Sequence, residues 1–413
     1  MKKGFFKWLS VCFAMIFFCL CISGCNNNKN SVAPGGIIME GISSPNFRLN
    51  LRDANHEIID ELDYVGMYPV SEGLIYLYIP EDATWTEYGS YTVDFYWYEW
   101  DTQNIVRIGR IPDFAHITTG PVCIDGHLYM YVSTGNLNTE EHWLKLIDLD
   151  IENLTMTEIF SEKDGCPYNS MAAQGDRLLM GKVLTGNASY LEEYHTKTGE
   201  RRVLLEAEFD TETKMGDIIQ SVASDGKTIS LIILESHGED PYGLRMDVYD
   251  LDMNFLHSVD LSHISSDNNE LNQWVAWFVA SGDMIYYENY SVTTFLGRIK
   301  NGKAERVLET TDDPGQYIFT TAIETQRDTQ TGVFARLYDA DEHYIYRMNY
   351  SDGSMERAAF CPEETGKRIT GLWRDGNDNL LIEMNDKEHS TAQERETTMY
   401  RVPLSELEFE PFL

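Results

Sequence analysis

The sequence predicts an all-β fold in which one four-stranded unit repeats along most of the chain. The unit is complete between Gly120 and Phe160, a glycine turn recurs at a nearly constant spacing, and a strand followed by a polar turn recurs at the same spacing. Successive side chains of a strand point to opposite faces of its sheet, and a small sheet with two apolar faces cannot bury both alone. We therefore expect neighbouring units to pack against one another.

The unit between Gly120 and Phe160 shows how each strand is expected to form. Asp125-Gly126 supplies the positive φ angles of a tight hairpin turn, and 127–132 alternates apolar and polar residues with the period of a strand. A polar loop, 133–141, separates it from a third strand, 143–149. The turn 150–154 then leads into a fourth strand, 155–160.

The glycine turn gives the first measure of the period. It recurs at Gly73, Gly126, Gly175, Gly226, Gly282 and Gly376, in steps of 53, 49, 51, 56 and 94 residues. The last step is about twice the others, so one copy has lost its glycine. We place that copy near 325–331, before the strand-like run 332–337.

The third strand gives an independent measure of the same period. Its copies end at Tyr98, Ile147, Tyr194, Tyr249, Ile299, Arg347 and Val402, in steps of 49, 47, 55, 50, 48 and 55 residues. Seven such units predict a β-propeller of seven four-stranded blades over 61–413. The predicted blades are 61–113, 114–163, 164–213, 214–266, 267–313, 314–363 and 364–413. A β-sandwich, two unrelated all-β domains, and a ring of six or eight blades are the alternatives.

The first 25 residues carry a targeting signal. A basic start with Lys2, Lys3 and Lys7 precedes the apolar run 8–22, which is short for a membrane span. The run ends in Ile22-Ser23-Gly24-Cys25, which resembles the lipobox of bacterial lipoproteins. That resemblance implies a lipoprotein signal peptide over 1–24 and a diacylglyceryl group on Cys25. The protein is then expected on the extracytoplasmic face of a bacterial cell membrane, where two acyl chains make a stable anchor.

Two segments connect this signal to the repeats. Residues 25–36 are polar and hold almost nothing to bury, which predicts a flexible tether. Within 37–60, the run Phe47–Leu51 is expected either to close the ring as an outer strand of the last blade or to form a short extra hairpin.

Composition excludes some partners and cofactors. With 67 acidic and 32 basic residues the net charge is −35, and the chain lacks the basic patch that nucleic-acid binding requires. Asp148, Asp150, Asp250 and Asp252 occupy the same turn of their units and are interpreted as turn formers, with calcium binding as the weaker alternative. We expect no metal and no cofactor.

The densest aromatic run is the candidate ligand-binding site. The run spans 85–100 and includes Trp85, Tyr88, Trp97 and Trp100. Its side chains are expected either to pack between blades or to present a platform for a sugar or a protein loop. No nucleophile elbow, phosphate loop or clustered metal-ligand motif occurs in the sequence, so no catalytic residue is predicted.

Over 61–413 the glycine turns and strand-turn pairs resemble the propeller domains of bacterial cell-surface lipoproteins, and more loosely TolB-type and low-density-lipoprotein-receptor-type propellers. The leader, the repeat and the lack of a catalytic motif together favour a lipid-anchored, non-enzymatic binding or scaffold protein that contacts an envelope component or a protein partner. The alternative is a propeller lyase or hydrolase acting on envelope polysaccharide or a lactone, because channel residues come from many blades and form no local motif.

Overall fold

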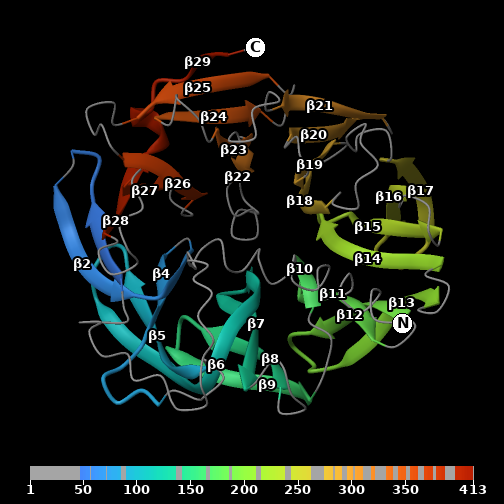
Figure 1. The fold of residues 1–413 in the computed structure, drawn as a ribbon, viewed down its shortest axis with the longest axis horizontal. Helices are drawn as coiled ribbons and strands as arrows, with labels where there is room; N and C mark the ends of the chain where they lie inside the picture. The colour runs from blue at the N-terminus through green and yellow to red at the C-terminus, as the bar shows by residue number, and fades with distance from the viewer. Residues whose placement is uncertain are drawn as a thin grey trace, which may run out of the picture.

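The computed structural model describes residues 47–412 with gaps, the longest of which are 136–141, 262–273, 310–317, 321–331, 361–366 and 387–395. The described residues form a ring of β-sheets around a central opening (Figure 1). Their helical content is one three-residue 3₁₀ helix, η3 (Leu404–Glu406). The predicted all-β propeller fold is confirmed.

The strands belong to five hydrogen-bonded sheets. The first runs β3 (Gly66–Pro69), β4 (Gly73–Tyr78), β5 (Tyr91–Glu99), β6 (Ile105–Ile124), β7 (His127–Gly135), β8 (His142–Asp150) and β9 (Thr155–Lys163). The second runs β10 (Tyr168–Gln174), β11 (Arg177–Thr185), β12 (Ala188–His195), β13 (Arg201–Asp210), β14 (Met215–Ser224), β15 (Thr228–His237), β16 (Gly243–Asp250) and β17 (Phe255–Asp260).

The other three sheets complete the ring. The third runs β18 (Trp274–Ser281), β19 (Met284–Tyr290), β20 (Phe295–Lys300) and β21 (Lys303–Glu309). The fourth runs β22 (Ile318–Thr320), β23 (Gly332–Leu337), β24 (Tyr344–Asn349), β25 (Met355–Ala359) and β29 (Glu410–Pro411). The fifth runs β2 (Ile58–Tyr64), β1 (Phe47–Arg52), β28 (Glu396–Pro403), β27 (Asn379–Asp386) and β26 (Lys367–Arg374).

The repeat unit is the predicted antiparallel meander. Asp125 and Gly126 adopt φ angles of 50° and 80°, which confirms the tight turn between the first two strands of the unit. Residues 105–124 are assigned as one strand, β6, which pairs with β5 up to Phe114 and with β7 from Phe114 onward. The change of partner falls at the predicted blade boundary, next to Asp113, whose φ is 53°. The seven-blade count stays a prediction.

The hydrophobic core lies between neighbouring blades. One cluster joins Ile75 and Phe95 of β4–β5 to Leu128 and Met130 of β7, and another joins Tyr131 of β7 to the next blade along the chain. In these blades the sheets therefore bury both faces against their neighbours, which explains why the buried strands carry near-continuous apolar runs.

A seam closes the ring between its first and last blades. Strand β1 pairs in parallel with β28 and antiparallel with β2, so 47–51 is both an outer strand of the last blade and half of a hairpin. Leu49 packs with Leu74 of β4 and Met399 of β28 in one buried cluster. The Tyr64 hydroxyl donates to Thr397 Oγ1 at 2.8 Å across the same sheet.

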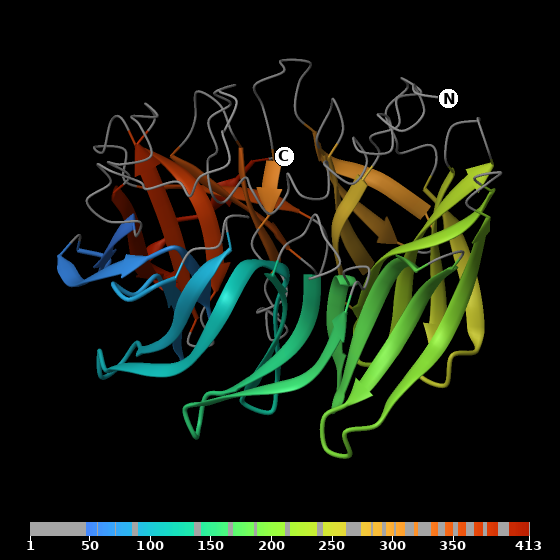
Figure 2. The same cartoon turned by 60° about the horizontal axis from the view of Figure 1, so that its bottom comes forward.

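The ring has two different ends. On one, which we call the turn face, short connections such as 124–127, 150–155, 174–177 and 195–201 join the strands, as the lower side of Figure 2 shows. The opposite end, the loop face, carries the connections 135–142, 185–188 and 237–243. Because β1 is parallel to β28, the chain enters β1 at the loop face.

Candidate functional site

The predicted aromatic platform is only partly within the described residues. Trp85 and Tyr88, like the lipidation candidate Cys25, lie outside them. Trp97 packs into the core between the β3–β6 and β6–β9 blades, and Trp100 packs into the seam with its Nε1 donating to the Val70 carbonyl at 3.2 Å. Both rings are buried, so of the two interpretations offered, packing between blades describes Trp97 and Trp100.

A polar cluster on the turn face is the best candidate site. It is built from the turn at Asp125, the start of β7, the end of β8 and two turns of the next blade. These elements bring together acidic, basic and aromatic side chains, which we call the turn-face cluster: Asp125, His127, Tyr129, Asp148, Asp176, Tyr194, His195 and Lys197.

Two carboxylate–histidine pairs organise the cluster. His127 Nδ1 lies 2.9 Å from Asp148 Oδ1 and 3.1 Å from Oδ2. His195 Nε2 lies 3.6 Å from Asp176 Oδ2. The His127 side chain is 36% exposed and that of Asp148 15%, so the carboxylate is held inside while the other edge of the imidazole reaches the surface.

Lysine and tyrosine side chains join the two pairs. Lys197 Nζ lies 3.6 Å from both Asp125 Oδ2 and Asp176 Oδ2 and bridges turns of two neighbouring blades. The Tyr129 ring stands 6.3 Å from that of His127 and 6.4 Å from that of Tyr194. The cluster is therefore continuous across the junction of two blades.

Burial sets the proton affinities within the cluster. Desolvation raises the pKa of Asp148, and the hydrogen bond from His127 opposes that rise. Burial likewise raises the pKa of Tyr129, followed by the charge of Asp148. A carboxylate that fixes one imidazole nitrogen leaves the other free to exchange a proton or to accept a hydrogen bond from a partner.

A second polar group sits at the loop end of the same blade. Ser133 Oγ lies 2.7 Å from His142 Nε2, and His116 occupies the register position opposite Ser133 on β6. Burial, then the nearby His142, lowers the pKa of His116 to about 4. Ser133 is fully buried, so this serine–histidine pair does not present a nucleophile to a substrate.

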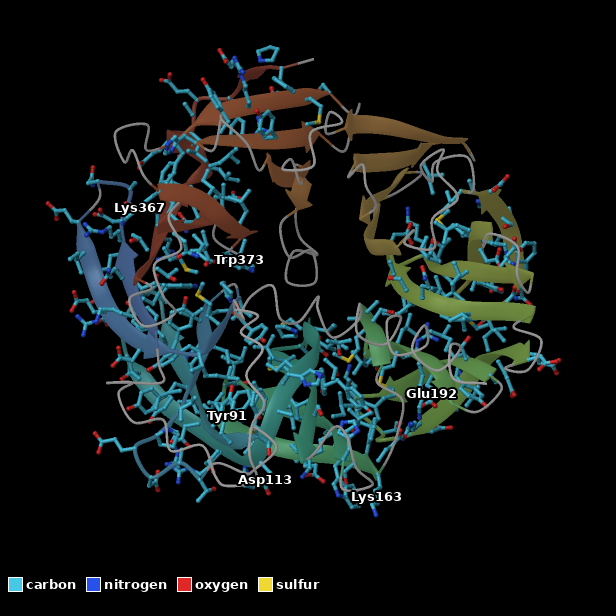
Figure 3. All side chains as sticks on the ribbon, viewed as in Figure 1. Tyr91, Asp113, Lys163, Glu192, Lys367 and Trp373 are labelled. Carbon is cyan, nitrogen blue, oxygen red and sulfur yellow. The ribbon has the colours of Figure 1, made fainter. Side chains whose placement is uncertain are left out.

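Several other acidic side chains are held inside the blades by arginine. Asp94, Glu192 and Asp247 are buried on the third strands β5, β12 and β16, and Figure 3 labels Glu192. Arg110 Nε donates to Asp94 Oδ1 at 2.7 Å, Arg201 Nε to Glu192 Oε2 at 2.8 Å, and Arg245 Nε to Asp247 Oδ2 at 3.0 Å. A buried charge needs such a partner, so these carboxylates stabilise the blades.

A cavity of about 10 Å³, the space of one water molecule, lies at the seam beside Tyr98, Trp100 and Arg401. Within the described ranges no group of three or more His, Cys, Asp and Glu side chains is placed to hold a metal ion. Asp150 accepts hydrogen bonds from the backbone and side-chain amides of Asn153, as expected of a turn former.

No helix in the described ranges is long and apolar enough to cross a membrane.

Sequence reasoning missed the turn-face cluster. Asp125 and Asp148 were treated as turn residues of one unit, whereas Lys197 belongs to the next unit. The usable signal was the period itself: turns that recur at equivalent positions of successive blades must meet on one face of the ring.

No family model and no curated protein matches the chain. Among solved structures, it is similar to the β-propeller domain of the Trilobed protease from Pyrococcus furiosus, with 11% identity over 72% of this chain and 82% of that one at a TM-score of 0.43. It is also similar to an acylaminoacyl peptidase from Pyrococcus horikoshii, with 11% identity over 70% of this chain and 51% of that one at a TM-score of 0.36. A chain of a mitotic checkpoint complex matches with 10% identity over 92% of this chain and 98% of that one, at a TM-score of 0.43. At such low identities and TM-scores, none of these assigns an activity to this chain.

Proposed function

We propose that this chain is a lipid-anchored, non-enzymatic binding or scaffold propeller on the extracytoplasmic face of a bacterial membrane. Its turn-face cluster would contact an envelope component or a protein partner. The observation that carries the proposal is the form of the cluster: charged groups of two blades, among them His127, Asp125 and Lys197, lie together at the surface beside two buried tyrosine rings. Such a mixed polar surface suits a large partner, whereas small-molecule sites are usually concave and mostly apolar.

The position of β1 supports this orientation. The chain enters β1 at the loop face, and we propose that the anchor at Cys25 holds that face toward the membrane. The turn face, at the opposite end of the ring, would then point away from the membrane, with His127 and Lys197 accessible to a partner.

Replacement of Cys25 tests the anchor. The unmodified protein should incorporate a labelled fatty acid and sediment with membranes, and Cys25→Ala should do neither. Cys123→Ala is the matched control, because Cys123 lies within the propeller and should leave labelling unchanged. A Cys25→Ala protein that still carries label or stays membrane-bound would contradict the anchor.

Site-specific photocrosslinking in cells tests the binding face. A photoreactive residue at Lys197 should give a discrete crosslinked product that disappears with His127→Ala. The same residue at Lys227, exposed in another turn of the turn face, is the control and should give none. Equal yields at both positions, or none at Lys197, would reject the cluster as the contact surface.

The His127–Asp148 pair also favours a second candidate function, hydrolysis or elimination on an envelope polysaccharide or a lactone. A carboxylate that orients Nδ1 leaves Nε2 to act as a general base, which typically contributes a factor of about 10²–10⁴ in rate. Purified protein should then turn over a member of a lactone and polysaccharide panel, and His127→Gln should reduce the rate at least about 100-fold. A panel without turnover would remove this candidate.

A further inference from the structure

The outer edge of the β22–β25 blade is covered by a segment that arrives from the next blade. After β28 the chain passes through η3 and forms β29, which pairs antiparallel with β25. Glu410 lies opposite Arg357, Pro411 lies opposite Glu356, and the Phe412 amide donates to the Met355 carbonyl at 2.9 Å. We call residues 407–412 the covering segment.

Side chains fix the covering segment at three points. Arg357 Nε donates to Glu410 Oε1 at 2.9 Å, and its guanidinium also stands 5.4 Å from the Phe412 ring centre. The Phe412 ring meets that of Tyr346 edge-on, with centroids 4.9 Å apart. The Arg347 guanidinium lies 4.0 Å from the centre of the Phe409 ring.

The surface beneath the covering segment has its own recognition chemistry. Arg357 stands 4.7 Å from the Tyr344 ring centre, and Arg347 Nε is held at 2.9 Å by Glu356 Oε2, so both guanidinium groups are positioned by residues of β24 and β25. Two oriented guanidinium groups beside aromatic rings select aromatic and acidic side chains. The outer edge of β25, which β29 occupies in this structure, selects an extended backbone.

The paired strand of the covering segment is lightly attached: it is two residues long, both are exposed, and the Glu410 side chain is 61% exposed. The start of the segment is held more firmly, because Leu407 and Phe409 pack, partly buried, against the core. In the described part of the chain, β9, β17 and β21 end their sheets without an added strand, so this cover is a feature of one blade. Elements with few buried contacts open locally far more often than the core does.

We propose that the outer edge of β25, with Tyr344, Arg347 and Arg357, is a docking site for an extended acidic segment of a partner protein that carries two aromatic side chains. Residues 409–412 occupy that site within the same chain. The partner segment adds a strand antiparallel to β25, places a carboxylate on Arg357 and a ring over each guanidinium, and displaces the covering segment. This site is separate from the turn-face cluster.

A binding titration with a labelled peptide tests the proposal. The probe is a fluorescent peptide with the sequence of residues 405–412, added to the full chain or to a full-length Phe409→Ser/Phe412→Ser variant whose own segment is weakened. A tethered segment competes at an effective concentration on the order of millimolar. The variant should therefore bind the peptide at least about tenfold more tightly than the unmodified chain. Glu408→Ser is the matched control, because Glu408 is exposed in the same segment and makes none of the three contacts above.

Two further variants make the result decisive. Arg357→Ala in the double-serine background should weaken peptide binding at least about tenfold, and a peptide with both phenylalanines replaced by serine should not bind. If the double-serine variant does not fold, Glu410→Lys in the full chain provides the weakened segment. Equal binding by weakened and unmodified chains, or binding that survives loss of Arg357, would overturn the proposal.

Discussion

His116, on β6 near the loop face, should lower the free energy of unfolding of the protein in mild acid. Burial, with the nearby His142, lowers the pKa of His116 from 6.5 to about 4. The unfolded chain therefore binds this proton more tightly than the folded chain does. The stability that depends on a neutral His116 is present in full above pH 6.5 and is lost as pH falls from there toward 4.

The size of the loss follows from the two pKa values. At pH 5, protonation favours the unfolded chain by about 2 kcal/mol, and at pH 7.5 by less than about 0.1 kcal/mol. The His116 ring is only half-buried, and water screens part of this cost. We therefore expect His116 to account for about 1–2 kcal/mol of lost stability between pH 7.5 and pH 5.

Urea unfolding at the two pH values measures this loss. Other groups titrate too, so the informative quantity is the pH-dependent change in the unmodified protein minus that in His116→Gln, which keeps a polar side chain but does not titrate. His257→Gln is the matched control, because His257 is exposed on β17 and its replacement should leave the pH dependence as it was. A difference near zero, or greater acid sensitivity in His116→Gln, would refute the reasoning.

Three further changes test packing and pairing. Gly73→Ala would place a Cβ 2.2 Å from the Tyr98 carbonyl oxygen and should cost about 2–3 kcal/mol, seen as a lower melting temperature. Asp94→Asn removes a buried partner of Arg110 and should lower the free energy of unfolding in urea by about 3 kcal/mol. Asp82→Asn, exposed on the same arginine, should leave the urea midpoint nearly unchanged. Tyr64→Phe removes the hydroxyl that crosses the seam and should cost about 1 kcal/mol; an unchanged midpoint would contradict that contact.

The fold could be predicted because its signals are local and repeated. An Asp-Gly turn specifies its own backbone angles, and Asp125-Gly126 adopts them. The repeat of about fifty residues predicted several small sheets, and these can bury both apolar faces only by packing on one another. The change of partner strand beside Asp113 had no glycine signal, because that positive-φ position carries aspartate.

The turn-face cluster could not be predicted from the sequence, for a different physical reason. Both faces of an inner strand are buried between blades, so alternation along 95–100 does not say which ring reaches solvent, and Trp97 does not. Contacts such as Lys197 with Asp125 join different blades and depend on how one sheet is rotated against the next. The return of Glu410 to β25 depends on the path after β28, which no repeat encodes.

The residues that stabilise this ring differ from the residues that its turn face exposes, and this difference would let the ring serve as a scaffold. Its core lies between blades, where Leu128 and Met130 are fully buried, while His127 beside them on β7 reaches the turn face. Surface substitutions away from the core usually change stability by less than about 0.5 kcal/mol. Replacing His127 or Lys197 should thus change what the face binds and leave the ring intact. A melting temperature that fell together with partner crosslinking would mean that the cluster holds the two blades together instead of contacting a partner.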